Sequence, residues 1–337
     1  MPAVRDGRQG VPDGEHTDSG AEEAHMTEID VAQPDDPRPD DPRLVDGVPT
    51  CPACGGTGRS RRYRADDYDL YRCVECRTEF LVLRPDGRPH DGHYWDDYKF
   101  EAYGNEESRA EYSQRYADVL AESSKYTSTI HRSLDVGCGI GNFASWAVDR
   151  GLDAVGAEVD EEAIGAARAR GLVVYELEEM ASAIEPGSLD LITMWDVIEH
   201  LVDPATAVRD LVPLLRPGGL MVLETPDVAF PLRPMAIAVR KVAEPIRYSD
   251  VLYFADHRTY FSVAGLRHLL EAEGLDFMTD MAMRSPNAKM RSQFDHMSEG
   301  SRGLTMGRLY GPLDRSMNAL RMTNKMIVIA RRSWDVR

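Results

Sequence analysis

The 337-residue sequence contains no run of 18 apolar residues, so it offers no candidate for a membrane-spanning helix. Its first residues, MPAVRDGRQGVPDGEH, lack the apolar core of a secretory signal. Cysteine is scarce too, since five cysteines are too few to hold a chain of this length as a disulfide scaffold. These absences exclude the membrane-spanning and disulfide-rich classes, and we expect a cytoplasmic location.

Positive charge is also in short supply. The chain has 39 Lys and Arg against 57 Asp and Glu, a formal net charge of −18, half of which falls in residues 1–50. Affinity for nucleic acids depends largely on neutralising phosphates, so we expect no nucleic-acid partner. One basic cluster is present, and a solvated hairpin is the simpler interpretation of it: Arg59, Arg61, Arg62 and Arg64.

The composition changes along the chain and divides it into four parts. Residues 1–47 are rich in Asp, Glu and Pro and too poor in apolar residues to offset chain entropy, which predicts a disordered acidic tail. Residues 48–85 suggest two short hairpins, and residues 86–128 a linker with a helical segment. From 129 to 333, short apolar runs alternate with amphipathic stretches, which predicts an α/β domain with a doubly wound parallel sheet. A cap or lid is expected at about 228–262, because long loops in compact domains tend to be functional.

Four of the five cysteines form two matched pairs, Cys51-x2-Cys54 and Cys73-x2-Cys76. Such a thiolate tetrad suits a tetrahedral Zn²⁺ ion, and the spacing predicts a zinc ribbon. A closed site of four sulfurs leaves no open position for catalysis, so a structural role is expected. An iron centre with similar ligands, a redox motif and a pair of disulfides are the alternatives.

A glycine-rich loop, LDVGCGIGNF, follows a predicted strand and opens a predicted helix. Glycines at 137, 139 and 141 allow a sharp turn and a close approach of the backbone to a ligand. The third glycine stands one position earlier than in the G-x-G-x-x-G pattern of dinucleotide sites, where Asn142 would have to be glycine. Asp135, two residues before the first glycine, would repel a pyrophosphate but attract an ammonium group. The ligand that fits both features is S-adenosylmethionine.

A second acidic residue supports this interpretation. Glu158 ends the next predicted strand, 21 residues after Gly137, where a carboxylate can accept both hydroxyls of a ribose. A solvated strand end is the alternative for Glu158. The glycine triplet, Asp135 and Glu158 together make the cofactor prediction specific.

The segments LDVGCGIGNF, GAEVD, SLDLITMWDVIEHLVDP and LRPGGLMVLETPD resemble successive motifs of class I S-adenosylmethionine-dependent methyltransferases, in particular the bacterial ubiquinone-type and sugar C-methyltransferase group. With CPACG and YRCVECRTEFL, the resemblance to members with an N-terminal zinc ribbon covers about residues 51–275. It implies a Rossmann-like seven-stranded sheet. The cofactor-binding residues that it implies are Asp135, Gly137, Gly139, Gly141, Glu158, Glu178, Trp195 and Asp196.

Two histidines are candidates for a general base, which is needed if the acceptor must lose a proton. His200 follows the predicted fourth strand, and His257 lies in the predicted cap, where Tyr260 could orient it. The segment around His257 resembles the Y-x-E-H-x-x-Y-F-S pattern of sugar C-methyltransferases, except that Phe254 stands in the tyrosine position. A structural hydrogen-bonding role is the alternative for either histidine.

The leading hypothesis is therefore an enzyme that transfers a methyl group from S-adenosylmethionine to O, C or N of a small molecule: a secondary metabolite, or a quinone-like or sugar-like acceptor. A homodimer is a further expectation. The alternatives are an inactive methyltransferase fold that acts as a binding or scaffold protein and, less favoured, an RNA methyltransferase.

Overall fold

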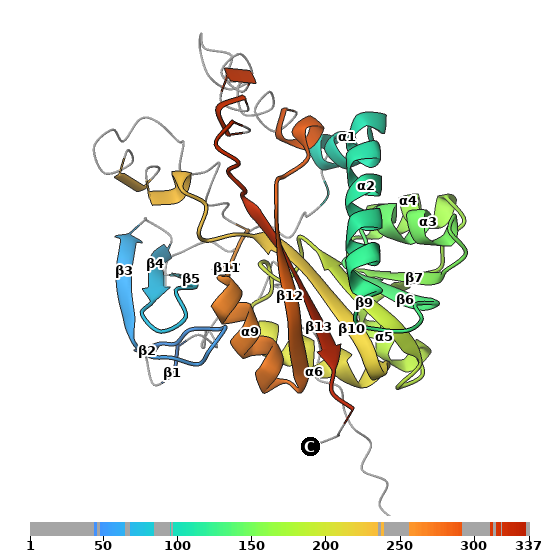
Figure 1. The fold of residues 1–337 in the computed structure, drawn as a ribbon, viewed down its shortest axis with the longest axis horizontal. Coiled ribbons are helices and arrows are strands. Elements are labelled where there is room, and N and C mark those ends of the chain that lie inside the picture. Colours follow the sequence, from blue (N-terminus) through green and yellow to red (C-terminus); the bar gives the residue numbers. More distant parts are fainter. Residues whose placement is uncertain are drawn as a thin grey trace, which may run out of the picture.

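A seven-stranded sheet forms the centre of the computed structural model (Figure 1). The strand order is β12-β13-β10-β9-β6-β7-β8. β13 runs antiparallel to β10 and β12, and the other neighbours are parallel. The strands are β6 (Arg132–Val136), β7 (Asp153–Glu158), β8 (Val174–Glu176), β9 (Leu189–Trp195), β10 (Leu215–Pro226), β12 (Leu275–Met283) and β13 (Lys325–Arg332). The predicted α/β, Rossmann-like fold is confirmed.

Helices cover both faces of this sheet, and local sequence signals set where they begin. Asp160 caps the first amide groups of α4, and Asp203 caps α6 just before Pro204, whose ring favours the first helical position. The helices are α1 (Asp97–Gly104), α2 (Glu106–Ser123), α3 (Asn142–Val148), α4 (Glu161–Ala169), α5 (Leu177–Ala183), α6 (Pro204–Leu211), the 3₁₀ turn η1 (Val212–Leu214) and α9 (Val263–Ala272).

The side chains of β13 show how the two faces are buried. Met326, Val328 and Ala330 pack into one core with α6 and α9, whereas Ile327 and Ile329 pack into another with α2 and α3. Because successive side chains of a strand point to opposite faces, this alternation places the sheet between two helical layers. A strand that is buried on both faces has the nearly continuous apolar sequence seen in KMIVIARR.

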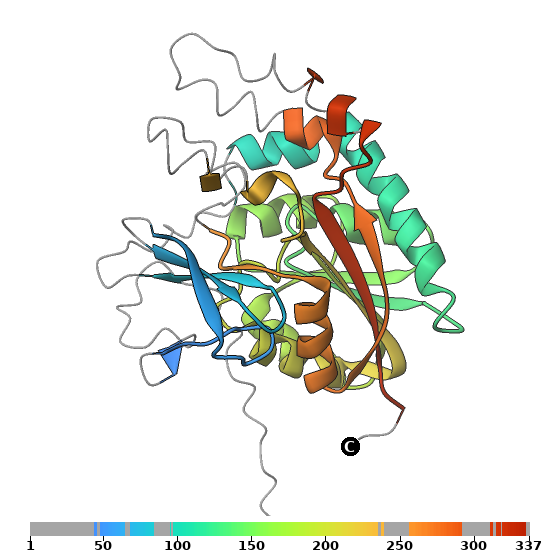
Figure 2. The same cartoon turned by 60° about the vertical axis from the view of Figure 1, so that its left-hand side comes forward.

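A second, four-stranded antiparallel sheet lies beside α9 (Figure 2). Three of its strands come from the cysteine-rich segment: β3 (Arg59–Arg64), β4 (Tyr68–Cys73) and β5 (Glu79–Leu83). The fourth, β11 (Thr259–Tyr260), comes from the distant segment that follows His257 and pairs with β5. A separate short pair is formed by β1 (Leu44–Val45) and β2 (Val48–Pro49).

The structure describes residues 44–45, 48–64, 68–83, 95, 97–234, 237–238, 256–291, 311–312, 315–317 and 319–334. Most of the predicted acidic tail, part of the linker and most of the predicted cap lie outside these residues. The domain boundaries, the cytoplasmic location and the homodimer stay predictions. Within the described part of the chain, no helix is both long and apolar enough to cross a membrane.

Candidate cofactor and acceptor site

The sheet reverses its strand order at β6, between β7 on one side and β9 on the other. In open α/β sheets, ligands bind outside the carboxyl ends of the strands at such a switch point. The glycine loop follows β6, and Trp195 and Asp196 stand at the end of β9. A cavity of about 310 Å³ opens there, lined by residues of both segments.

The glycine loop has the conformation that its sequence predicts. Gly137, Gly139 and Gly141 have φ angles of 67°, 53° and 75°, in the left-handed region that favours glycine. A Cβ atom added at Gly139 would lie 2.1 Å from the ring of Trp95, and one added at Gly141 would lie 2.3 Å from Leu172. The loop therefore cannot accept side chains without moving its neighbours.

The two acidic candidates lie on either side of this loop. Asp135 is 2% exposed and accepts a hydrogen bond of 2.7 Å from the Thr193 hydroxyl, and burial raises the pKa of its carboxyl to about 8. Glu158 accepts a hydrogen bond of 2.7 Å from the amide of Gly139, which ties the end of β7 to the loop. Burial also raises the pKa of Glu158, and backbone amide donors oppose that rise. Both side chains line the cavity.

The other cofactor candidates are placed differently from one another. Trp195 lines the cavity, with its ring 4.8 Å from the ring of Tyr116. Asp196 lines it too, and accepts from Lys289 at 3.0 Å and from Lys325. Glu178 is exposed on α5, and its neighbour Leu177 lines the cavity instead.

The two candidate histidines are brought together in the lining of the same cavity. Their ring centroids are 4.6 Å apart, and the ring planes cross at 86°. A ring nitrogen of His200 lies 3.1 Å from the carbonyl oxygen of Asp256. Burial lowers the pKa of both histidines, and the pKa of His257 falls well below its usual value, with His200 as a further cause. Both rings are therefore neutral near pH 7, the form that can accept a proton.

Tyr260 lies close to this pair but outside the cavity lining. Its ring centroid is 5.5 Å from that of His257, and its side chain is fully buried within the small sheet and the core beneath it. The guanidinium of Arg233 lies 4.1 Å from the centre of the Tyr260 ring.

Two sets of charged residues near the cavity were not predicted from the sequence. Glu199 is fully buried, and its carboxylate lies within 4.8 Å of the ring nitrogens of His200 and His257. Burial raises the pKa of Glu199 to about 8. The second set is a network of ion pairs. Arg115 of α2 forms an ion pair of 2.6 Å with Glu224, and Lys325 lies near both Glu224 and Asp196. Glu224 follows the apolar run LMVL of β10, and Lys325 precedes the apolar run MIVIA of β13, so a charge beside an apolar run is the sequence signal for both.

Comparison with known proteins shows the family of this chain. The model of a family described as a methyltransferase domain matches residues 108–279. The chain belongs to this family. A ubiquinone biosynthesis O-methyltransferase of Aeromonas salmonicida is 29% identical over 152 residues, covering 43% of this chain and 62% of that protein. Its counterpart in Methylococcus capsulatus is 34% identical over 101 residues, covering 28% of this chain and 43% of that protein. The matches thus span less than two thirds of these curated relatives.

Among solved structures, an S-adenosylmethionine-dependent methyltransferase from Archaeoglobus fulgidus aligns with 70% of this chain and all of its own, at 17% identity and a TM-score of 0.43. The predicted resemblance to class I methyltransferases is confirmed by the family match. The family uses S-adenosylmethionine, and this methyltransferase domain has features that fit the molecule: a loop too tight for side chains, and buried carboxylates at the ends of β6 and β7.

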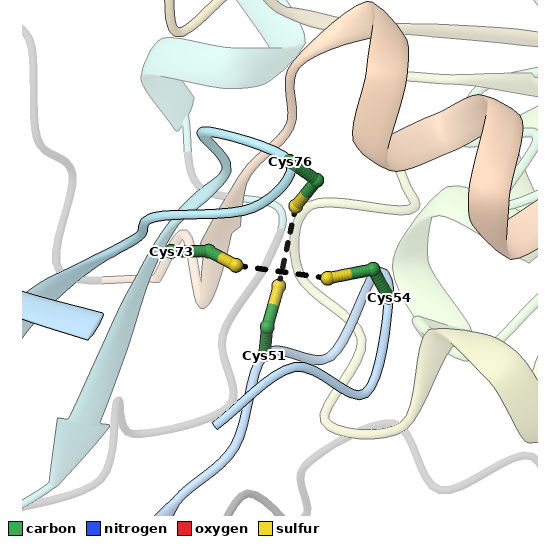
Figure 3. A group of neighbouring side chains, drawn as sticks. All are labelled: Cys51, Cys54, Cys73 and Cys76. Atoms are coloured by element: carbon green, nitrogen blue, oxygen red, sulfur yellow. Dashed lines mark hydrogen bonds between the residues drawn. The ribbon is translucent and has the colours of Figure 1, made fainter. Parts of the chain in front are cut away.

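The four paired cysteines of the methyltransferase lie together, as the spacing predicts. Their sulfur atoms point toward one another (Figure 3) and lie within 4.8 Å of each other. The distance is 3.5 Å between the sulfurs of Cys51 and Cys76 and 3.6 Å between those of Cys54 and Cys73, and none of the four is in a disulfide. Hydrogen bonding between the two thiols lowers the pKa of Cys76 and raises that of Cys51. This donor set fits a tetrahedral thiophilic cation such as Zn²⁺.

Proposed function

We propose that the protein transfers a methyl group from S-adenosylmethionine to a small-molecule acceptor. One observation carries the proposal: the glycine loop with its two buried carboxylates shares a single cavity with a pair of neutral histidines. A cofactor half and an acceptor half that meet in one cavity are what in-line methyl transfer requires, because catalysis depends mainly on proximity and alignment.

On the cofactor side, Asp135 would bind the ammonium group and Glu158 the ribose hydroxyls, while Gly137, Gly139 and Gly141 let the backbone approach the methionine part. Trp195 and Asp196 would border that part. S-adenosylmethionine, when bound, supplies an electrophilic methyl group on a good leaving group. Glu178 is exposed, so an adenine contact through Leu177 is the simpler arrangement.

On the acceptor side, His257 would accept the proton that the acceptor loses, with His200 as the second candidate. The lowered pKa leaves both rings unprotonated near pH 7 but also makes them weaker bases, so the place of the pair in the cavity lining is what supports this role. The relatives are named for ubiquinone O-methylation, so an aromatic hydroxyl is the first acceptor group to test. Carbon and nitrogen acceptors, including sugar-like ones, follow it.

We further propose that Cys51, Cys54, Cys73 and Cys76 hold one structural zinc ion. Four cysteine ligands would complete its coordination, so the ion would contribute to folding and leave no position for the acceptor.

The test of the proposed function begins with the cofactor. S-adenosylmethionine and its demethylated product should raise the melting temperature, because a ligand that binds only the folded state stabilises it. Gly139→Val should abolish that shift, since its side chain would collide with Trp95, whereas Gly165→Ala is the control because a Cβ there meets nothing within 4 Å. Stabilisation by NAD and not by S-adenosylmethionine would overturn the proposal.

Transfer itself is measured with methyl-labelled cofactor and a panel of catechols, phenols and sugar nucleotides. Formation of labelled product by the wild-type protein, and its loss when His257 is replaced, would support the proposed methyltransferase activity. Tight cofactor binding without transfer to any compound would favour the alternative of an inactive binding protein.

A further inference from the structure

The segment that carries His257 belongs to the sheet of the cysteine module. β11 begins two residues after His257 and pairs with β5, with Thr259 opposite Phe80 and Tyr260 opposite Glu79. The amide of Leu81 also donates to the carbonyl oxygen of Arg258 at 2.9 Å. The backbone next to His257 is therefore held by the cysteine module.

A second contact joins this segment to the cysteine turn itself. The hydroxyl of Ser262 donates to the carbonyl oxygen of Cys76, and it accepts a hydrogen bond of 2.9 Å from the amide of Gly265. The amide of Ser262 donates to the Thr78 hydroxyl at 3.3 Å. Ser262 thus caps helix α9 and at the same time anchors the end of β11 to a cysteine of the tetrad.

The packing around this contact is tight. A Cβ atom added at Gly265 would lie 2.1 Å from the Thr78 hydroxyl and 3.2 Å from Ala53. The cysteines share one core with Phe261 and Leu266. A shift of the cysteine turn would therefore be passed on to β11 and α9.

On its other side, the same segment holds the second histidine. The amides of Arg258 and Thr259 donate to the carbonyl oxygen of Glu199, at 2.7 and 3.0 Å. Glu199 immediately precedes His200. The segment at 258–259 thus connects β5 of the cysteine module to the turn that carries His200, and it fixes how the two rings meet.

We infer that the cysteine module positions His257 against His200 for methyl transfer, and that Ser262 is the positioning residue that joins the module to this segment. The inference rests on the proposed function, because it assigns the histidines to the acceptor side. The glycine loop lies between β6 and α3 and has no part in these contacts. Disturbing the link should therefore weaken transfer and spare cofactor binding.

Three substitutions of Ser262 separate the link from the helix cap. Ser262→Asp keeps an oxygen that caps α9 but cannot donate to the Cys76 carbonyl when ionised. Ser262→Thr keeps both hydrogen bonds, and Ser262→Ala loses both. Ser60→Ala is the matched control, since Ser60 is an exposed serine of the same module that pairs with Arg72 on the far side from β11.

The measurements are cofactor affinity by calorimetry, bound zinc per chain, the single-turnover rate of methyl transfer and the ring signals of isotope-labelled histidines by NMR. We expect Ser262→Asp to keep its zinc and its cofactor affinity, to shift the His257 and His200 signals, and to slow transfer roughly 10- to 100-fold, the cost of a misplacement of about 1 Å. Ser262→Thr should restore both the rate and the signals.

Unchanged histidine signals and an unchanged rate in a zinc-loaded Ser262→Asp protein would overturn the inference. A parallel loss of cofactor affinity and rate would overturn it too, because it would mean general destabilisation. Failure of the proposed function is distinguishable, since the wild-type protein would then bind no S-adenosylmethionine or bind it without methyl transfer, while the NMR comparison still reports whether the link positions the histidines.

Discussion

At the scale of single residues, the proposed contact of Asp135 with the cofactor's ammonium group would couple cofactor binding to pH. Burial raises the pKa of its carboxyl to about 8, so the free protein holds it mostly protonated at neutral pH. Pairing with the ligand's ammonium group requires the carboxylate. Binding should therefore release a proton below pH 8 and tighten as pH rises toward 8, by up to about tenfold per pH unit.

This prediction is checked by calorimetric titration of S-adenosylhomocysteine between pH 6 and 9, in buffers of different ionisation enthalpy. The Asp135→Asn variant should bind S-adenosylhomocysteine more weakly, and its affinity should lose the steep dependence on pH. Comparing the variant with the wild type separates the titration of Asp135 from that of the ligand. The stability of the ligand-free protein should change with pH in the opposite direction to the affinity. The native carboxyl holds its proton above the pH at which the unfolded one loses it, so this group makes the free protein less stable as pH rises from about 4 to 8. Affinity of the wild type that does not vary with pH would argue against an ammonium contact.

Substitution of His257 tests which residue is the general base. If His257 is the base on the proposed acceptor side, His257→Ala should slow the single-turnover rate by roughly 10²–10⁴-fold with little change in cofactor affinity. His200→Ala is the paired variant, and the larger loss identifies the base. A purely structural histidine would instead lower the melting temperature and weaken binding and transfer together. An unchanged rate would leave proximity as the main catalytic contribution.

At the scale of elements, the cysteine module is a four-stranded sheet only because β11 completes it. We predict about one zinc ion per chain, measured by elemental analysis, and no visible absorption of the kind that an iron–thiolate centre gives. Cys73→Ser should release the metal and speed hydrogen exchange in β4 and β5, while the affinity for S-adenosylmethionine should change little, because the glycine loop makes none of the hydrogen bonds that join the module to β11. Four thiols that react freely in the native protein would exclude a bound metal.

Sequence patterns predicted those elements whose signals are local. The glycine loop, the strand that precedes it and the cysteine pairs each carry their chemistry within about ten residues, and all were found. The pairing of β11 with β5 was not predicted, because Thr259 and Phe80 are 179 positions apart and a two-residue strand has no periodicity. Lys325 and Glu224 were missed for a related reason: each charge stands out beside an apolar run, but the sequence does not show that the two residues meet across β10 and β13.

At the scale of the whole molecule, the charge distribution favours a small-molecule acceptor over RNA. The net charge is −18, and two of the four arginines of β3 lie close to acidic partners: Arg61 is 3.8 Å from Asp69, and Arg62 is 3.7 Å from Glu79. This arrangement leaves little positive potential to release counterions from a phosphate backbone.

The last prediction follows from that balance. The full-length protein should pass through heparin resin at about 0.15 M salt, where the Debye length of about 8 Å already screens separated surface charges. Asp69→Asn, which removes the acidic partner of Arg61, should increase retention slightly at low salt and serves as the positive control. The rate of methyl transfer to a small acceptor should change little with ionic strength, because the surface ion pairs that salt screens contribute little energy. Firm retention of the wild-type protein on heparin, with transfer that falls steeply as salt rises, would instead favour a nucleic-acid acceptor held by the cysteine module.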